Sequence, residues 1–180
     1  GPATATAADP CTLLTDAELT TLAGSVGEGK VVLVSGLPTC RWTTASGGFV
    51  QVVDVPATTW LATLPELLAT LKESDTLGQS SEYMERLQES VDDVESGMPI
   101  SATQACTLFS DLAELQGLPA GSTQSVQLIP NRDDPQMVAG QACQNGRFTT
   151  VSVADTTGFD GNPPTAQVKQ ALKKVLGRTS

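Results

Sequence analysis

The hexapeptide CTLLTD occupies residues 11–16, and the similar hexapeptide CTLFSD occupies residues 106–111. Each copy begins on one of only four cysteines in a chain of 180 residues. Both copies continue into the tripeptide AEL and then into an Ala-Gly pair. We therefore expect two related structural units, each of which begins at its own cysteine.

The four cysteines are even in number and lie far apart, at Cys11, Cys40, Cys106 and Cys143. The chain has no histidine and no closely spaced cysteine pair, which argues against a zinc site. Two disulfides are the better interpretation. Four cysteines allow three connectivities, and the repeat favours Cys11–Cys40 with Cys106–Cys143. Such bonds persist outside the cytosol. The alternative is four buried free thiols in a cytosolic protein.

The sequence after the first cysteine predicts a helix followed by strands. Thr15 and Glu18 have the spacing of a capping box, and Gly24 can end this short helix. A β-branched run at residues 30–35 predicts a strand, and a strand of alternating type follows Cys40. A further helix is predicted from apolar residues at helical spacing, which are Trp60, Leu61, Leu64, Leu67, Leu68 and Leu71.

The second unit is predicted to repeat this order of elements. Asp111 and Glu114 would take the two capping positions, displaced by one residue. Residues 122–130 predict the corresponding strand, and Cys143 opens the next one. The closing helix is predicted from an apolar stripe of Val168, Ala171, Leu172, Val175 and Leu176. Basic residues lie towards its end, where the helix dipole favours cations: Lys173, Lys174 and Arg178.

These patterns predict an α+β fold, in which helices pack on an antiparallel sheet. We expect two related α-β-β-α halves, residues 9–72 and 101–178, each containing a disulfide. Residues 73–100 are expected to form a connecting acidic helix, and residues 1–8 to be a tether or cleavage remnant, with one globular domain overall. The alternative is an ordinary α+β domain whose elements alternate without duplication.

The connecting segment has an amphipathic pattern. Met84, Leu87, Val91 and Val94 form the apolar stripe, and Ser80 or Ser81 can cap the helix. The opposite face carries the acidic residues Glu82, Glu85, Glu89, Asp92, Asp93 and Glu95. We expect a solvated acidic face, and a partner-binding helix is the alternative.

The net charge of −10 restricts the partners of this protein. A field of this sign repels phosphate backbones and anionic lipid surfaces, so we expect neither nucleic-acid binding nor electrostatic membrane attachment. A cationic partner is compatible with it, although solubility is the commoner reason for an acidic surface. The opening GPATATAADP resembles a cleavage remnant and a flexible polar tether. We therefore expect membrane attachment only through a lipid anchor that has been removed.

Two segments between residues 9 and 55 form a recognisable pattern, an opening segment and a C-x-W segment. Their residues are Pro10, Cys11, Leu13, Leu14, Thr15, Glu18, Cys40 and Trp42. In this pattern the chain resembles small secreted actinobacterial lipoproteins grouped as domain of unknown function 3558, and the resemblance is weaker beyond residue 55. The resemblance implies an extracytoplasmic, membrane-tethered location and no particular chemistry. The chain is more distantly similar to extracytoplasmic sensor domains of actinobacterial receptor kinases.

Catalytic groups are scarce in this sequence. Without histidine there is no Ser-His or Cys-His pair, and paired cysteines leave no thiol nucleophile. Neighbouring carboxylates on one element point in different directions, so the acidic pairs do not predict acid–base catalysis: Asp92 with Asp93, Asp133 with Asp134, and Asp155 with Asp160. The spacing of Asp155, Asp160 and Asn162 is not that of a calcium-binding EF-hand loop, so we expect a plain turn there. We predict no enzyme, no cofactor and no bound metal.

Two aromatic residues are the candidate contacts for a ligand or partner. Trp42 follows Cys40 closely, and we expect it to pack over a disulfide, with ligand contact as the alternative. Phe159 lies between Gly158 and Asp160 in a predicted loop and is expected to be exposed.

The expected function is non-enzymatic binding or sensing by a monomeric extracytoplasmic domain. Its ligand would be a small apolar molecule or lipid between sheet and helices, or a protein on an exposed face. The alternative is a structural or assembly partner of another envelope protein. A hydrolase that uses only carboxylates such as Asp133 or Asp160 is the least favoured hypothesis.

Overall fold

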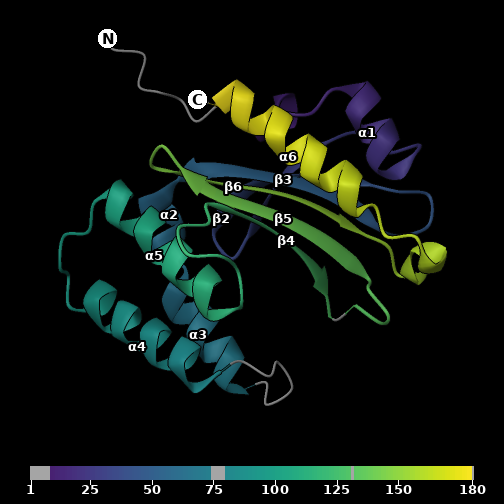
Figure 1. Cartoon of the computed structure of the whole chain (residues 1–180). Coiled ribbons are helices and arrows are strands. Elements are labelled where there is room, and N and C mark those ends of the chain that lie inside the picture. Colours follow the sequence, from purple (N-terminus) through teal and green to yellow (C-terminus); the bar gives the residue numbers. More distant parts are fainter. Residues whose placement is uncertain (1–8, 74–79, 131, 180) are drawn as a thin grey trace, which may run out of the picture. The chain divides into compact units, whose positions relative to one another are not determined.

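The computed structural model describes residues 9–73, 80–130 and 132–179. The strands are β1 (Lys30–Val34), β2 (Leu37–Thr43), β3 (Phe49–Pro56), β4 (Gln124–Ile129), β5 (Met137–Gln144) and β6 (Arg147–Ala154). They form one antiparallel sheet in the order β1-β2-β3-β6-β5-β4 (Figure 1). The helices are η1 (Pro10–Thr12), α1 (Asp16–Ala23), α2 (Ala57–Leu61), α3 (Leu64–Glu73), α4 (Ser81–Glu95), α5 (Ala102–Leu115), η2 (Gly158–Gly161) and α6 (Thr165–Thr179). The predicted α+β class is confirmed.

The chain divides into two compact units. Unit 1 comprises the described residues within Gly1–Val55, Val126–Ala142 and Thr149–Ser180, and unit 2 those within Pro56–Ser125 and Cys143–Phe148. Each unit therefore combines segments from both predicted halves. In the sheet, β1 to β3 come from the first half and β4 to β6 from the second, in mirrored order. The common origin of the two halves stays a prediction.

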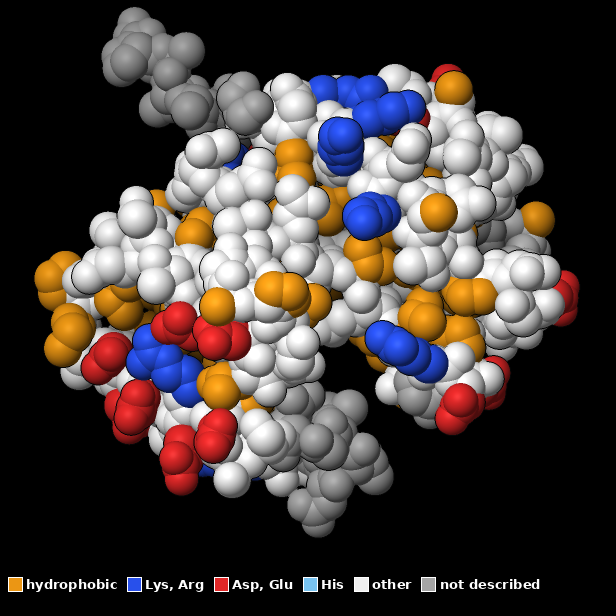
Figure 2. All heavy atoms as spheres, in the orientation of Figure 1, with side chains coloured by type: hydrophobic (Ala, Val, Ile, Leu, Met, Phe, Trp, Pro, Cys, Tyr) orange, Lys and Arg blue, Asp and Glu red, His pale blue; other side chains and the backbone are white. Residues whose placement is uncertain are grey.

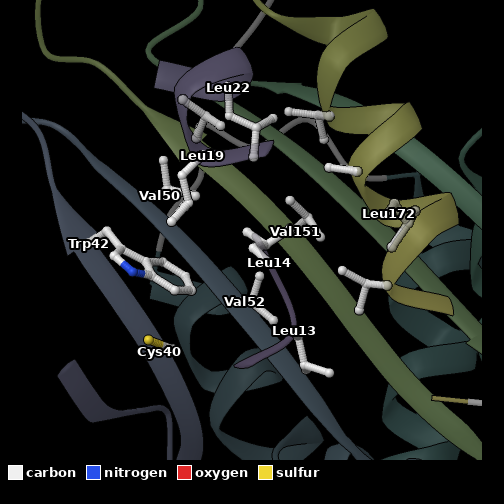
Figure 3. Packing of buried hydrophobic residues seen from close by; sticks show 14 of the residues in the cluster. Leu13, Leu14, Leu19, Leu22, Cys40, Trp42, Val50, Val52, Val151 and Leu172 are labelled. Carbon is white, nitrogen blue, oxygen red and sulfur yellow. The ribbon is translucent and has the colours of Figure 1, made fainter. Parts of the chain in front are cut away.

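The core of unit 1 lies between the sheet and two helices, α1 and α6, which cover one of its faces (Figure 1). Alternate residues of the strands point into this core, including Val50 and Val52 of β3, because side chains of a strand alternate between the two faces. Leu19 and Leu22 of α1 and Leu172 of α6 pack onto the same cluster, as Figure 3 shows. The amphipathic pattern predicted for the closing helix is thereby confirmed.

The first two strands form a tight hairpin. The turn residues Ser35 and Gly36 both have positive φ, at 50° and 79°, which is the geometry of a two-residue hairpin turn. The strands are in the register in which Val34 pairs with Leu37 and Val31 with Cys40. This register places Cys40 on the core side of β2, where it is fully buried.

The core of unit 2 contains an aromatic cluster. Trp60 stacks on Phe148 with ring centroids 5.2 Å apart, and Phe109 meets both rings edge-on. Such arrangements stabilise a core by about 1 kcal/mol per pair beyond the area that they bury. Tyr83 of α4 is also buried, and desolvation raises the pKa of its hydroxyl. These residues lie on α2, α4, α5 and the start of β6.

One of the two predicted capping boxes is confirmed and the other is wrong. Thr15 accepts a hydrogen bond from the backbone N–H of Glu18, whose carboxylate accepts one from the N–H of Thr15. In the second unit the capping pair is Ser101 with Gln104. The helix therefore begins before Cys106, and Asp111 lies within it. Aligning the two cysteines places the second helix start after Cys106. The segment SATQ, residues 101–104, has the same capping pattern and begins five residues before Cys106.

The other predicted helices differ in their bounds. The segment predicted as one helix over residues 60–71 consists of two, α2 and α3, and Leu67 on α3 is 37% exposed instead of buried. Within the predicted helix 73–100, α4 spans Ser81–Glu95 and its cap Ser80 is confirmed. Residues 74–79 of that prediction lie outside the described residues.

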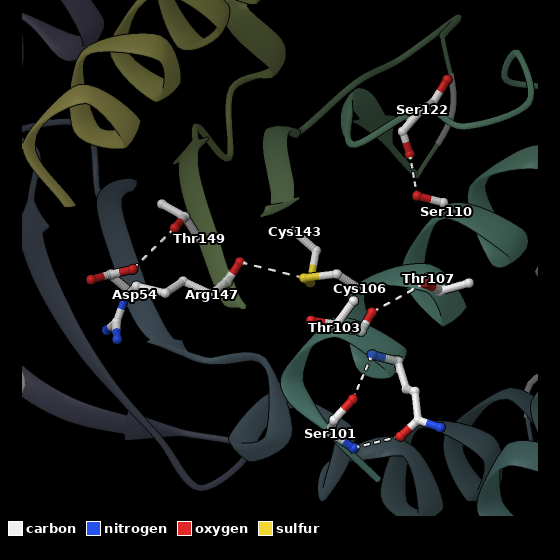
Figure 4. Close-up of a disulfide and its surroundings, with 11 residues drawn as sticks. Asp54, Ser101, Thr103, Cys106, Thr107, Ser110, Ser122, Cys143, Arg147 and Thr149 are labelled. Carbon is white, nitrogen blue, oxygen red and sulfur yellow. Dashed lines mark hydrogen bonds between the residues drawn. A yellow bond between two sulfur atoms is a disulfide. The ribbon is translucent and has the colours of Figure 1, made fainter. Parts of the chain in front are cut away.

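Both predicted disulfides are present. Cys11 bonds to Cys40 in unit 1, and Cys106 bonds to Cys143 in unit 2. Figure 4 shows the second bond, beside which Cys106 Sγ lies 3.9 Å from the carbonyl oxygen of Arg147. Two disulfides indicate an oxidising environment, since thiols stay reduced in the cytosol.

Candidate functional site

A groove in unit 2 is the best candidate for a binding site. It has a volume of about 270 Å³ and lies among α2, α4, α5 and the connection between α4 and α5. Its apolar lining consists of Leu61, Met98, Pro99, Ile100 and Leu108, and its polar lining of Arg86, Ser90, Asp93, Gln104 and Thr107. This volume is just below the usual range for small-molecule sites, so the groove matches a small ligand or a short chain.

The rim of the groove is held in place by the end of α4. The N–H of Met98 donates to the carbonyl of Asp93 at 3.3 Å, and the N–H of Gly97 donates to that of Val94 at 3.2 Å. Gly97 has a φ of 76°, which is the left-handed conformation that ends many helices. This closed turn presents Met98, which is 55% exposed, beside the groove. A methionine side chain adapts readily to the shape of an apolar ligand.

The charge around the groove is negative. Helix α4 carries six carboxylates and one basic residue, Arg86, which gives a net charge of −5, half of the total for the chain. Figure 2 shows acidic side chains gathered over this helix, at the lower left. The predicted acidic face is therefore present, and it borders a groove instead of facing solvent alone.

Arg86, the arginine that lines the groove, already forms ion pairs with two carboxylates. Arg86 Nη2 donates to Asp111 Oδ2 at 3.0 Å, and Nη1 lies 3.4 Å from Glu89 Oε2. Both ion pairs are partly exposed and contribute little to stability. In contrast, the half-buried carboxylate of Asp93 makes no hydrogen bond or ion pair with the residues that the structure describes. Within the described part of the chain, the groove therefore offers the negative charge of Asp93, without a partner, next to apolar walls.

Trp42, one of the two predicted contact residues, belongs to the core of unit 1. Its side chain is 5% exposed and lies on the same face of β2 as Cys40 (Figure 3). Gly29 faces both, because a Cβ at this glycine would lie 2.6 Å from Trp42 Nε1 and 2.9 Å from Cys40 Sγ. The expected packing of Trp42 over a disulfide is confirmed, and its contact with a ligand stays a prediction.

We expect Gly29→Ala to lower the free energy of unfolding by about 2 kcal/mol, since the new methyl group must displace a buried indole and a disulfide. Gly27→Ala is the matched control, because its Cβ would lie 3.4 Å from Thr43 Oγ1, close to ordinary contact. This control should cost no more than about 0.5 kcal/mol. Chemical denaturation followed by circular dichroism measures both values, and equal losses would contradict the packing described here.

The expected exposure of Phe159 is wrong. The residue lies in the short helix η2 with a φ of 60°, is half-buried, and packs against the core of unit 1. A loop rich in glycine and aspartate indicates a surface position, but it does not show which way an aromatic side chain turns. The role of Phe159 as a partner contact stays a prediction.

The acidic turn after β6 has a local structural role. Asp155 Oδ1 accepts hydrogen bonds from the N–H and the hydroxyl of Thr157, at 2.9 and 2.6 Å, which closes a turn. Asp160 is exposed. No group of three or more His, Cys, Asp or Glu residues among the described residues is placed to hold a metal ion.

An ion-pair cluster joins α1 to α6 in unit 1, and the sequence patterns did not predict it. Arg178 donates from Nη1 and Nη2 to the two carboxylate oxygens of Glu18, at 2.6 and 2.8 Å, and also to the carbonyl of Leu13 at 2.8 Å. Lys174 Nζ lies 3.7 Å from the same carboxylate. Arg178, the largest cause, and the capping bonds from Thr15 outweigh burial and lower the pKa of Glu18 to about 2.

A small polar hollow of about 160 Å³ lies beside this cluster, between α1 and α6. It is lined by Thr15, Glu18, Thr21, Gln167, Gln170 and Lys174, among others. Because its charged groups already bind each other, the hollow offers less to a ligand than the groove of unit 2.

No protein-family model and no curated protein sequence matches this chain. Among the described residues, no helix has both the length and the apolar character needed to cross a bilayer.

Proposed function

We propose that this protein is an extracytoplasmic, non-enzymatic binding domain of a secreted lipoprotein, of the class that its opening segment resembles. The two disulfides support a location outside the reducing cytosol. The proposed site is the groove of unit 2, and the ligand class is a short apolar chain with a positive charge at one end.

The observation that carries this proposal is the half-buried carboxylate of Asp93, which lies beside an apolar wall and has no partner among the residues that the structure describes. A buried or half-buried charge is costly without a partner, and a cationic group would supply one. The negative charge of α4 would also raise the local concentration of cations and speed their association. Met98 and Ile100 would contact the apolar part of the ligand.

Hexylammonium is a suitable probe, with hexanoate as the probe of opposite charge. In an NMR titration of the whole protein, we expect hexylammonium to shift the amide signals around Asp93, Met98 and Ile100, and hexanoate to leave them unchanged. Asp93→Asn should weaken binding by about three- to tenfold, which corresponds to about 1 kcal/mol. Added salt should weaken the binding of hexylammonium as well.

Asp92→Asn is the matched control. Asp92 is exposed, accepts a hydrogen bond from Gln88 Nε2 at 2.9 Å, and does not line the groove. The substitution Asp92→Asn should leave the affinity for hexylammonium almost unchanged. Equal effects of the two substitutions would show that only the general field of α4 matters. Absence of shifts around the groove at millimolar hexylammonium would refute this site.

A further inference from the structure

The two edge strands of the sheet differ in how well their side chains prevent pairing with a further strand. Strand β1 is the terminal strand at one end and β4 at the other. On β1, Val31 is 55% and Leu33 is 73% exposed. Strand β4 instead carries the polar residues Gln124 and Gln127, its one exposed large apolar residue is Ile129 at 38%, and Pro130 follows it. Polar residues and proline commonly keep an edge from pairing, and β1 has only one charge, Lys30.

The hydrogen-bonding groups of β1 that face outward belong to the same two apolar residues. In a hairpin with a two-residue turn, the pair that closes the turn, Val34 with Leu37, is hydrogen-bonded. Hydrogen-bonded and non-hydrogen-bonded pairs then alternate along the strands. The N–H and C=O groups of Val31 and Leu33 therefore point away from β2. In the described part of the chain, no strand pairs with this edge.

We propose that β1 is an interface between two copies of this chain, which pair antiparallel about a two-fold axis at Val32. In this register Val31 and Leu33 of one copy exchange hydrogen bonds with Leu33 and Val31 of the second copy. Lys30 lies opposite Val34, so that no like charges meet. The two sheets would join into one, and the exposed apolar side chains would cover one another.

Strand β1 can pair antiparallel with the same strand of another molecule, because Val31 and Leu33 then face each other and Lys30 faces Val34. This favours a second copy of the chain as the partner of this edge. A self-complementary contact is what a two-fold dimer requires, because the same patch serves both subunits. The net charge of −10 opposes the approach of two copies. Dimerisation should therefore become stronger as salt is added, because salt screens this repulsion. The groove ligand proposed above should show the opposite dependence on salt, so the two proposals can fail separately.

Sedimentation equilibrium of the whole protein, from micromolar to near-millimolar concentration and at two salt concentrations, tests the dimer. We expect a monomer–dimer equilibrium whose dissociation constant falls at high salt. Leu33→Lys should raise that constant about tenfold or more, since it places a charge on the paired edge. Leu67→Lys, at an exposed leucine on α3, is the matched control and should leave it unchanged.

Val32→Cys provides a second readout that does not depend on weakening the contact. Residues facing each other at a non-hydrogen-bonded pair lie about 4.5 Å apart between Cα atoms, which a disulfide can span. Mild oxidation should therefore give a covalent dimer, and Val34→Cys, away from the axis, should give none. A monomer at every concentration and salt would overturn the proposal. So would a dimer that Leu33→Lys leaves intact or that Val32→Cys fails to link.

Discussion

Replacing Cys11 and Cys40 together by alanine is expected to lower the free energy of unfolding by about 3.5 kcal/mol. The bond spans 29 residues, and its loss returns the conformational entropy of this loop to the unfolded chain. The loop contains α1 and β1, so that the bond fixes the start of unit 1 to its sheet. Urea denaturation at pH 7, followed by circular dichroism and by tryptophan fluorescence, measures the loss.

The second disulfide provides the comparison. It spans 37 residues, and the same reasoning predicts a slightly larger loss, about 4 kcal/mol, for the pair Cys106→Ala and Cys143→Ala. The single substitution Cys11→Ala breaks the same bond and should cause a loss of similar size. A loss below about 1 kcal/mol in either double variant would show that the bond does not constrain its unit.

Acidification should remove about 2 to 3 kcal/mol of stability that depends on Glu18. The pKa of its carboxyl is about 2 in the folded protein, against an ordinary value of 4.5. A lowered pKa means that the folded state favours the ionised form. The stabilisation is therefore complete above pH 4.5 and is lost as the pH falls towards 2. The lower end of the range, about 2 kcal/mol, allows for screening of the ion pair by solvent, since the side chain of Arg178 is 36% exposed.

The difference in the free energy of unfolding between Glu18→Gln and the unsubstituted protein, measured as a function of pH, isolates this contribution. Glutamine can still accept the N–H of Thr15 in the capping box, but it cannot form the ion pair with Arg178. The two stability curves should be separated at pH 7 and converge between pH 4.5 and 2. Glu28→Gln, which removes an exposed carboxylate of the same unit, should run parallel to the unsubstituted protein. Parallel curves for Glu18→Gln would refute this role.

The sequence predicted those features that depend on local spacing. The capping box at Thr15, the apolar stripe of α6 and the hairpin strands around Cys40 all follow from patterns within one element. The disulfide pairing was predicted from the repeat and is confirmed. The repeat also gave one wrong prediction, because aligning the two hexapeptides places the second helix start after Cys106, whereas the helix is capped by Ser101.

Features that depend on distant segments could not be predicted in this way. Glu18 and Arg178 are 160 residues apart, and nothing in either local pattern indicates the partner. The groove similarly combines residues of α2, α4 and α5, and the closed turn at Gly97 decides that Met98 lies at its rim. The sequence predicted an acidic face on α4, but only the structure shows that Asp93 borders an apolar wall.

The most direct test of this account is the state of the four cysteines in the protein as its cell makes it. Thiols are blocked with an alkylating agent at the moment of harvest, and unreduced peptides are then mapped by mass spectrometry. We expect linked peptides for Cys11–Cys40 and Cys106–Cys143 and no blocked cysteine. Blocked cysteines, or a bond from Cys11 to Cys106 or Cys143, would contradict the proposal of a disulfide-stabilised extracytoplasmic binding domain.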